Sequence, residues 1–285
     1  MIESKTLYGS KDYTPTEAKD RLALEKRILG FLESNGYEHV LLPSLEYLES
    51  IKPGLGLSPD ALVSFKDNDS QSLVLRPDPT AAIARMAATR LKSSKLLKLS
   101  YAEPVFRRHA NEGVQEFFQI GVECIGESSI KSDSDLLKLC LKSLKQLGLS
   151  DVILLLNHKQ GLEGLSSDQL NSLKQKNYVD LGYIPKQVPL EDVNEHKKLA
   201  AASYFSQLLD VGDELKSIRI DTALIKDLSY YTGFFFDVIV PGYKHVIASG
   251  GRYDQLLDAF GSKRPAVGFA IYLNRLQESV KGRQT

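Results

Sequence analysis

A polar set inside an apolar stretch carries the clearest chemical signal in this sequence. In FRRHANEGVQEFFQIGVECIG, Arg107, Gln119 and Glu123 are spaced i, i+12 and i+16 across an expected hairpin, so their side chains can share one side of a sheet. Arginine can bind a carboxylate or phosphate through two N–H groups, whereas Glu123 and Gln119 can receive an ammonium. A surface hairpin with ordinary ion pairs is the alternative, but polar residues within FFQIGVECI favour a binding site, because their burial must be compensated.

A second polar set lies in LRPDPT, where Arg76, Asp78 and Thr80 follow an apolar run and precede an Ala-rich one. This pattern predicts a strand-to-helix turn. Asp78 can hold an amino group and Thr80 can add a hydroxyl contact. Capping of the helix by Asp78 or Thr80 is the alternative, which the sequence alone favours.

Two further clusters are weaker signals. In DLSYYTGFFFDV, Tyr230 and Tyr231 are adjacent, so on a strand they would face opposite sides, one lining a pocket and the other packing in the core. In GGRYD, the glycines before Arg252 and Tyr253 permit a close approach by a ligand. Each cluster alone is as typical of a core strand or a tight turn.

Metal, cofactor and covalent chemistry find no support in the residue pattern. The five histidines have no paired-ligand spacing, and Cys124 and Cys140 form no C-x-x-C motif. No G-x-G-x-x-G or Walker A sequence occurs, and no nucleophile–base–acid set is recognisable. We therefore expect no metal, no cofactor and no catalytic residue.

Composition points to a protein of the cytoplasm. The 285 residues include 36 basic and 36 acidic side chains, and this zero net charge argues against extensive nucleic-acid binding. No apolar run approaches the roughly 20 residues of a membrane span. The polar N-terminus lacks a secretory h-region, and two cysteines suit a reducing compartment.

Hydrophobic periodicity predicts a mixed α/β protein with a mainly antiparallel sheet. Thr14 and Glu17 have capping-box spacing before a helix that Gly36 ends. A short buried strand interrupted by Pro43 is expected next. The remaining elements expected are a strand–turn–helix at 72–93, a long hairpin at 95–126, a helix at 134–150, strands at 151–157, 217–224, 230–243 and 245–251, and a final helix near 270–280. The lysine-rich, helical segment from about 159 to 215 is interpreted as an insertion in one core domain spanning 1–285.

Taken in order, these clusters resemble the core of class II aminoacyl-tRNA synthetases, in the histidyl-tRNA synthetase branch. GYEHVLLPSLEYLE is similar to motif 1, the dimer-interface helix and strand, and EPVFRRHANEGVQEFFQIGVECIG to motif 2. LRPDPT resembles the loop L-R-P-E-x-T, LIKDLSYYTGFFFDV the strand with R-G-L-D-Y-Y-T, and PAVGFAIYLNRL motif 3. The resemblance runs from Gly9 to Leu276. It implies an α+β fold, with an antiparallel sheet flanked by helices and a small helical insertion.

The departures from the family concern the ATP side of the site. Arg107 is kept, but Val114 and Gln115 take the place of the second motif 2 arginine. Lys226 replaces an arginine and cannot reproduce its bidentate fork. In motif 3, Arg275 remains, whereas Tyr272 replaces the glycine under the adenine. Only ten residues follow Arg275, so we expect no anticodon-binding domain.

The amino-acid side is better preserved. The resemblance implies a histidine pocket formed by Asp78, Thr80, Arg107, Gln119, Glu123, Tyr231, Arg252 and Tyr253. With a degraded ATP site at Gln115, Lys226, Tyr272 and Arg275, the chain resembles the regulatory subunits of ATP phosphoribosyltransferase, a family of synthetase paralogues.

That second resemblance implies a subunit without catalysis of its own, which activates a short-form catalytic subunit and lets histidine inhibit it. Its partners would be that catalytic subunit, a second copy of this chain within a hetero-oligomer, and histidine as effector, with neither tRNA nor membrane. The alternatives are a truncated histidyl-tRNA synthetase-like enzyme that activates an amino acid with ATP, and a scaffold that has lost both roles.

Overall fold

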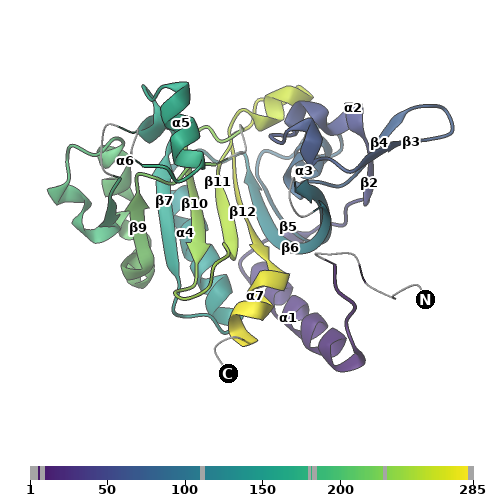
Figure 1. Ribbon diagram of the computed structural model, residues 1–285, viewed down its shortest axis with the longest axis horizontal. Helices are drawn as coiled ribbons and strands as arrows, with labels where there is room; N and C mark the ends of the chain where they lie inside the picture. Colours follow the sequence, from purple (N-terminus) through teal and green to yellow (C-terminus); the bar gives the residue numbers. More distant parts are fainter. Residues whose placement is uncertain are drawn as a thin grey trace.

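The computed structural model describes residues 6, 10–109, 113–178, 181, 185–226 and 230–281, which form two sheets with helices on either side (Figure 1). The nine strands of the large sheet follow the order β1-β5-β6-β12-β11-β10-β7-β9-β8. Their bounds are β1 Glu38–His39, β5 Leu97–His109, β6 Gly113–Ile125, β7 Ile153–His158, β8 Gln187–Pro189, β9 Ile218–Asp221, β10 Phe234–Ile239, β11 Ala248–Arg252 and β12 Ala266–Tyr272. The small sheet contains β2 Leu45–Tyr47, β3 Ser64–Lys66 and β4 Ser72–Leu75.

Strand direction is mixed in the large sheet. Most neighbouring strands are antiparallel, as expected, but β1 pairs with β5 and β7 pairs with β9 in parallel. A parallel pair needs a long crossover between its strands. In the second pair this crossover is residues 159–217, the segment interpreted as an insertion, which also supplies edge strand β8. The boundaries of that insertion stay a prediction.

Helices cover both faces of the large sheet. The α-helices are α1 Pro15–Ser34, α2 Leu48–Ile51, α3 Pro79–Thr89, α4 Ile130–Gln146, α5 Ser167–Lys174, α6 Ala202–Gln207 and α7 Leu273–Lys281. Short 3₁₀ segments are η1 Lys52–Gly54, η2 Pro59–Ala61, η3 Lys159–Leu162, η5 Leu190–Glu195, η6 Leu208–Ser217 and η7 Leu256–Phe260. Helices α1, α4 and α7 share the main core with the even-numbered residues of β6, whereas α3 packs on the odd-numbered residues of β5.

Local sequence signals account for several element ends. The backbone N–H of Thr14 donates to Glu17 at 3.1 Å, and Gly36 adopts a φ of +82° after the last turn of α1, so the predicted limits of this helix are confirmed. The hairpin of β5 and β6 is also confirmed, with its tip at 110–112 outside the described residues. Towards the tip the hairpin is less buried and its side chains are more polar, because these ends of β5 and β6 extend beyond the rest of the sheet.

Three expectations about elements were wrong. The buried strand at 38–49 is instead two short strands in different sheets, and Leu41 is 81% exposed between them. Tyr230 and Tyr231 precede β10 and do not alternate on a strand. Residues 270–272 end β12 and do not start the last helix. For 38–49 and 270–272, pairing with strands that are distant in sequence decides the outcome.

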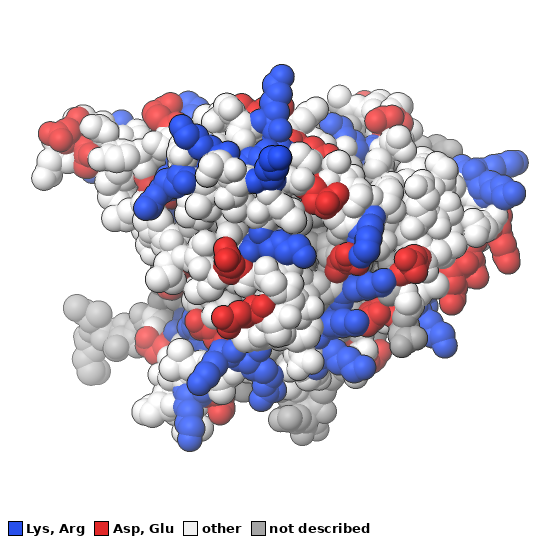
Figure 2. Space-filling view, turned by 180° about the vertical axis from the view of Figure 1, so that it is seen from behind, with Lys and Arg blue, Asp and Glu red and all other residues white. Residues whose placement is uncertain are grey.

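Charges of both signs are interspersed on the face seen in Figure 2. Within the described residues, no helix is long and apolar enough to cross a membrane.

A fully buried arginine connects the elements that surround the sheet face on the α3 side. Arg76 Nη1 donates to the carbonyls of Leu42 (2.8 Å) and Pro43 (2.6 Å). Its Nη2 donates to Glu103 Oε2 at 2.7 Å and to the carbonyl of Pro104 at 3.0 Å. Glu103 Oε1 accepts the backbone N–H of Leu42 at 2.8 Å. Arg76 therefore ties the segment before β2 and the turn before α3 to the middle of β5.

Replacing this arginine should strongly destabilise the fold. Arg76→Ala leaves the Glu103 carboxylate and several carbonyls without their donor, so we expect a loss of about 3–5 kcal/mol in the free energy of unfolding. Urea denaturation followed by circular dichroism measures it. Lys131→Ala is the matched control: it breaks an exposed pair with Asp135 and should leave the free energy of unfolding nearly unchanged. Equal losses in both variants would contradict the proposed role of Arg76.

Candidate functional site

A small cavity opens on the face of the large sheet that α3 flanks. Paired strands place residues of matching register on this face, so Glu123, Gly268 and Gly251 form one row and Gln119 lies opposite Tyr272. The cavity volume is about 40 Å³, several times the roughly 10–15 Å³ that one water molecule needs. Its lining is Asp78, Thr80, Tyr101, Arg107, Gln119, Glu123, Tyr230, Tyr231, Ser249, Gly250, Tyr253, Gly268, Phe269, Ala270 and Tyr272.

Glycines make room for the polar groups at the cavity floor. A Cβ on Gly268 would lie 1.9 Å from Glu123 Oε2 and 2.6 Å from the Tyr253 hydroxyl. A Cβ on Gly121 would lie 2.4 Å from the Tyr101 hydroxyl. Any side chain at these positions would therefore displace the groups that line the cavity.

Glu123 is the deepest charged group of the cavity. Its Oε1 accepts a hydrogen bond from the Thr80 hydroxyl at 2.7 Å, while its buried Oε2 has no partner among the described residues. The buried hydroxyl of Tyr253 likewise has none. Burial raises the pKa of Glu123 well above its ordinary value, opposed by the Thr80 hydrogen bond and reinforced by Asp78. Such unpaired buried polar atoms are costly, and a ligand N–H would satisfy them.

Asp78 both caps a helix and lines the cavity. Its Oδ1 accepts the backbone N–H of Thr80 at 2.8 Å, which is the N-cap of α3. Its Oδ2 accepts the hydroxyl of Tyr230 at 3.2 Å. The two alternatives for Asp78, capping and pocket lining, are therefore compatible in one side chain.

Arg107 supplies positive charge to the cavity. Its Nε donates to the carbonyl of Pro77 at 2.7 Å, and its guanidinium lies 5.3 Å from the ring centre of Phe117. Its terminal nitrogens have no hydrogen-bond partner among the described residues, so they can form two parallel hydrogen bonds to a carboxylate. With Asp78 just before α3 as the acidic group, the cavity offers both charge signs, which suits a small amphoteric molecule.

The structure places Arg252 away from this cavity. Its Nε donates to Asp133 Oδ1 at 2.9 Å, and its Nη1 to Asp254 Oδ1 at 2.8 Å. The carbonyl of Glu127 and the hydroxyl of Ser132 accept from its other N–H groups. Arg252 therefore connects β11 to the start of α4, whereas the other seven predicted pocket residues line the cavity.

Lys226 is also turned away from the cavity. Its ammonium donates to the carboxylate of Asp237 and to the hydroxyl of Ser249. The adjoining residues 227–229 lie outside the described chain. Because an aspartate already neutralises it, Lys226 presents no free charge to a ligand carboxylate or phosphate.

Tyr272 occupies space beside Arg275. The Tyr272 ring lies 5.9 Å from that of Phe117, and the Arg275 guanidinium is 4.6 Å from the Tyr272 ring centre. Arg275 Nη1 donates to the carbonyl of Val246 at 3.1 Å. A flat slot between an aromatic ring and a guanidinium suits a purine, but here the chain's own tyrosine packs against both groups.

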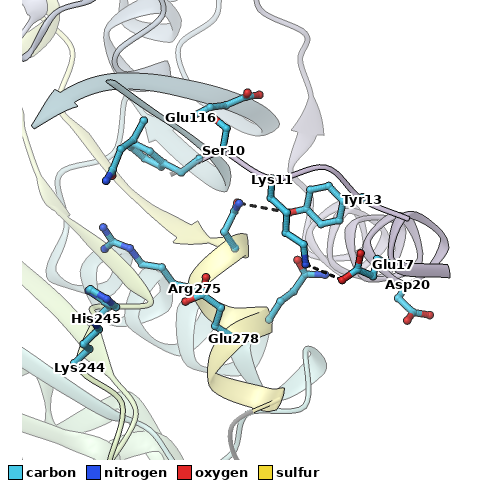
Figure 3. Close-up of a pocket in the computed structure, with 14 residues that line it drawn as sticks. Ser10, Lys11, Tyr13, Glu17, Asp20, Glu116, Lys244, His245, Arg275 and Glu278 are labelled. Atoms are coloured by element: carbon cyan, nitrogen blue, oxygen red, sulfur yellow. Dashed lines mark hydrogen bonds and ion pairs between the residues drawn. The ribbon is translucent and has the colours of Figure 1, made fainter. Parts of the chain in front are cut away.

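Gln115 and Arg275 line a separate cavity of about 530 Å³ next to the start of α1 and α7 (Figure 3). Lys244 and His245 lie on the same side as Arg275, and Glu17 and Asp20 on the other. Lys11 donates to Glu17 at 2.8 Å and, with Thr14, lowers the pKa of Glu17 to about 2. Four carboxylates in the lining, from Glu17, Asp20, Glu116 and Glu278, offset the cations of Lys11, Lys244 and Arg275, so this cavity offers no excess of positive charge to a triphosphate.

Sequence reasoning missed Tyr101 and Gly268, and it named Tyr230 beside Tyr231 but left it out of the predicted pocket. Tyr101 and Tyr230 line the cavity with deeply buried hydroxyls, and burial raises both pKa values well above the ordinary range. Gly268 forms its floor. The available signals were Tyr101 on the same strand face as Arg107, and the isolated glycine in PAVGFA, which in a strand marks a close approach.

Comparison with known proteins identifies the family. A family model described as Histidyl-tRNA synthetase matches residues 9–183 and 184–276. The ATP phosphoribosyltransferase regulatory subunits of a Geobacillus species and of Carboxydothermus hydrogenoformans are 32% and 31% identical over 95% of this chain, and the alignments cover 80% and 95% of those proteins. The chain belongs to the ATP phosphoribosyltransferase regulatory subunit family.

Solved structures agree with that membership. An ATP phosphoribosyltransferase regulatory subunit/histidyl-tRNA synthetase from Bacillus halodurans has a TM-score of 0.87 at 26% identity, covering 98% of this chain and 83% of that one. A histidine–tRNA ligase subunit from Alicyclobacillus acidocaldarius has a TM-score of 0.79 at 28% identity, covering 99% and 98%. The expected class II synthetase-like α+β fold of the regulatory-subunit family is thus confirmed.

The buried carboxyl of Glu123 makes the stability of this regulatory-subunit family member depend on pH. A pKa that folding raises stabilises the native state below the unfolded pKa, and this contribution is lost as the pH rises. Glu123→Gln stays neutral at every pH. We therefore expect the difference in free energy of unfolding between the variant and the parent to shift in favour of the variant as the pH is raised from ~5 to ~8. Urea denaturation at both pH values measures this, and a difference independent of pH would contradict the buried, proton-holding role.

Proposed function

We propose that this chain is a non-catalytic regulatory subunit of ATP phosphoribosyltransferase in histidine biosynthesis. It activates a short-form catalytic subunit, which joins ATP to phosphoribosyl pyrophosphate and releases pyrophosphate and N1-phosphoribosyl-ATP. Histidine bound to the regulatory chain inhibits that reaction. One observation carries the proposal. The cavity contains side chains that can bind an amino acid, whereas the neighbouring positions that resemble an ATP site lack the arginines and the glycine that ATP binding needs.

The cavity suits free histidine in charge and hydrogen bonding. Arg107 matches the carboxylate of an amino acid, and Asp78 with Thr80 and Gln119 can receive its ammonium. Glu123 and the Tyr253 hydroxyl, both with buried atoms that lack partners among the described residues, match the polar edge of an imidazole. Tyr231 and Tyr230 add flat apolar walls.

Adenylation of the amino acid is disfavoured on the same evidence. Lys226 is neutralised by Asp237, and Tyr272 packs between the cavity and Arg275. A synthetase must place a triphosphate against arginine forks, which lysine and glutamine do not reproduce. The chain is therefore proposed to bind the amino acid without activating it.

Inhibition then follows from linkage. Histidine lowers the activity of the complex only if it binds the inactive state more tightly than the active one. If the cavity is closed in the inactive state and open in the active one, histidine would form buried hydrogen bonds with Glu123 only in the inactive state, and it would therefore bind that state more tightly.

Removal of the Glu123 carboxyl should weaken histidine inhibition of the reconstituted complex. A buried polar group left without its hydrogen-bond partner costs about 1–3 kcal/mol, so Glu123→Ala should raise the half-inhibitory histidine concentration about tenfold. Assembly with the catalytic subunit should be unchanged. Glu116→Ala, an exposed carboxylate on the same strand but outside the cavity, is the control. Unchanged inhibition in Glu123→Ala would place the histidine site elsewhere.

ATP–pyrophosphate exchange tests whether the chain has kept the synthetase reaction. We expect the purified chain to show no exchange above background with histidine, because Lys226 and Gln115 cannot replace the missing arginines. Histidine-dependent exchange by the chain alone, abolished in Arg107→Ala, would instead favour the truncated-enzyme alternative.

We also propose that two copies of the chain associate through the segment that resembles motif 1. Leu41, Leu45 and Tyr47 are 81%, 49% and 51% exposed, a concentration of apolar surface suited to burial in an interface. Their backbone is held by Arg76 through the carbonyls of Leu42 and Pro43.

A charge in this surface should separate the copies. Leu41→Asp places a carboxylate in the interface, so we expect a halved mass by light scattering at micromolar concentration. Tyr178→Asp, at a 44% exposed aromatic outside this segment, is the matched control and should leave the mass unchanged. A parent protein that is already monomeric would contradict the proposed interface.

A further inference from the structure

A second concave surface lies behind Tyr231. Segment η3 and helix α5 face the core there and leave a groove of about 430 Å³, within the usual range for small-molecule sites. Leu162 and Leu170 line one side, and Ile225, Tyr231 and Phe235 the other. The rings of Tyr231 and Phe235 are 5.9 Å apart and form a continuous aromatic surface.

The groove is distinct from the cavity of the proposed histidine site. Tyr231 lines both, so its ring forms part of the wall between them. The ion pair of Lys226 with Asp237 and its bond to Ser249 form another part of that wall, because Lys226 lines the groove and Ser249 lines the cavity. A molecule in the groove would contact the far side of residues that shape the cavity.

Lysines outnumber acidic residues in the lining of the groove. Lys159, Lys174 and Lys226 line it, with Glu163 as the acidic residue among the lining. Lys226 is neutralised by Asp237 and Lys174 already has a partner, so Lys159 is the cation that the groove can offer to a ligand. The backbone N–H of Lys159 donates to the carbonyl of Gly233 at 3.0 Å, which fixes the position of this residue beside the core.

We propose that this groove binds a small organic anion with an apolar ring or chain. Leu162, Leu170, Ile225 and the two aromatic rings receive the apolar body, and Lys159 receives a carboxylate or sulfonate at the rim. A neutral apolar molecule would contact the apolar side chains but form no ion pair with Lys159. A compact inorganic anion would pair with Lys159 but make no apolar contacts. The site therefore selects for both parts in one molecule.

The test uses 8-anilinonaphthalene-1-sulfonate as the probe on the 285-residue chain. Titration should perturb the methyl NMR signals of Leu162, Leu170 and Ile225 in a saturable manner with one dissociation constant. Lys159→Glu should weaken that binding about fivefold by reversing the rim charge, while the neutral N-phenyl-1-naphthylamine should bind as before. Leu170→Glu should weaken both probes at least tenfold. Leu96→Glu, at a half-exposed leucine outside the groove, is the matched control.

Perturbations confined to other methyl groups, or equal affinity in Lys159→Glu and the parent, would overturn the proposal. The measurement involves neither histidine nor the catalytic subunit. A negative result would therefore not contradict the proposed regulatory function, and a failure to bind histidine would not contradict the proposed groove site.

Discussion

The buried guanidinium of Arg76 is the constraint on which the geometry of the site depends. Its donors connect its own segment to two others that are distant in sequence, through the carbonyls of Leu42, Pro43 and Pro104 and the carboxylate of Glu103. Because Asp78 and Thr80 follow Arg76 immediately, their distance from β5 and β6 is set by these bonds. A lysine could not satisfy as many acceptors in one plane. The exposed apolar segment around Leu41 and the polar cavity are therefore mechanically connected through one side chain.

The cavity and the positions that resemble an ATP site depend on different structural features. The polar groups of the cavity are positioned by strand pairing and by glycines that leave space for them. Gly268, for example, has no side chain, which leaves room for Glu123 and Tyr253. A triphosphate site depends on long cationic side chains that converge from several loops, and we propose that single replacements such as Tyr272 or Lys226 suffice to disable it. The chain can thus keep the shape of an amino-acid pocket while losing the charges of a nucleotide site.

Much of the fold was predictable where short-range rules act. The capping box at Thr14, the hairpin of β5 and β6, and helix α4 follow from residues within a few positions of each other. The segment at 38–49 was not predictable, because its two strands join different sheets. Within the site, the parity of Gln119 and Glu123 on one strand placed both correctly on the cavity face. Arg252 could equally serve a pocket or a buried ion pair, and only the position of Asp133 on α4 decides between them. The roles assigned to these residues stay predictions.

The position of β12 in the strand order affects how the protein is made. This strand, Ala266–Tyr272, lies between β6 and β11 and is the only bridge in the described strand order between β1-β5-β6 and the strands from β11 to β8. A ribosome synthesises it after all of the others. Until it emerges, the nascent chain exposes two unpaired edges, at β6 and at β11, and such edges are prone to pair with other chains. Synthesis and ligand recognition are thereby linked, since the residues of the cavity come from both halves and meet only when the last strand is inserted.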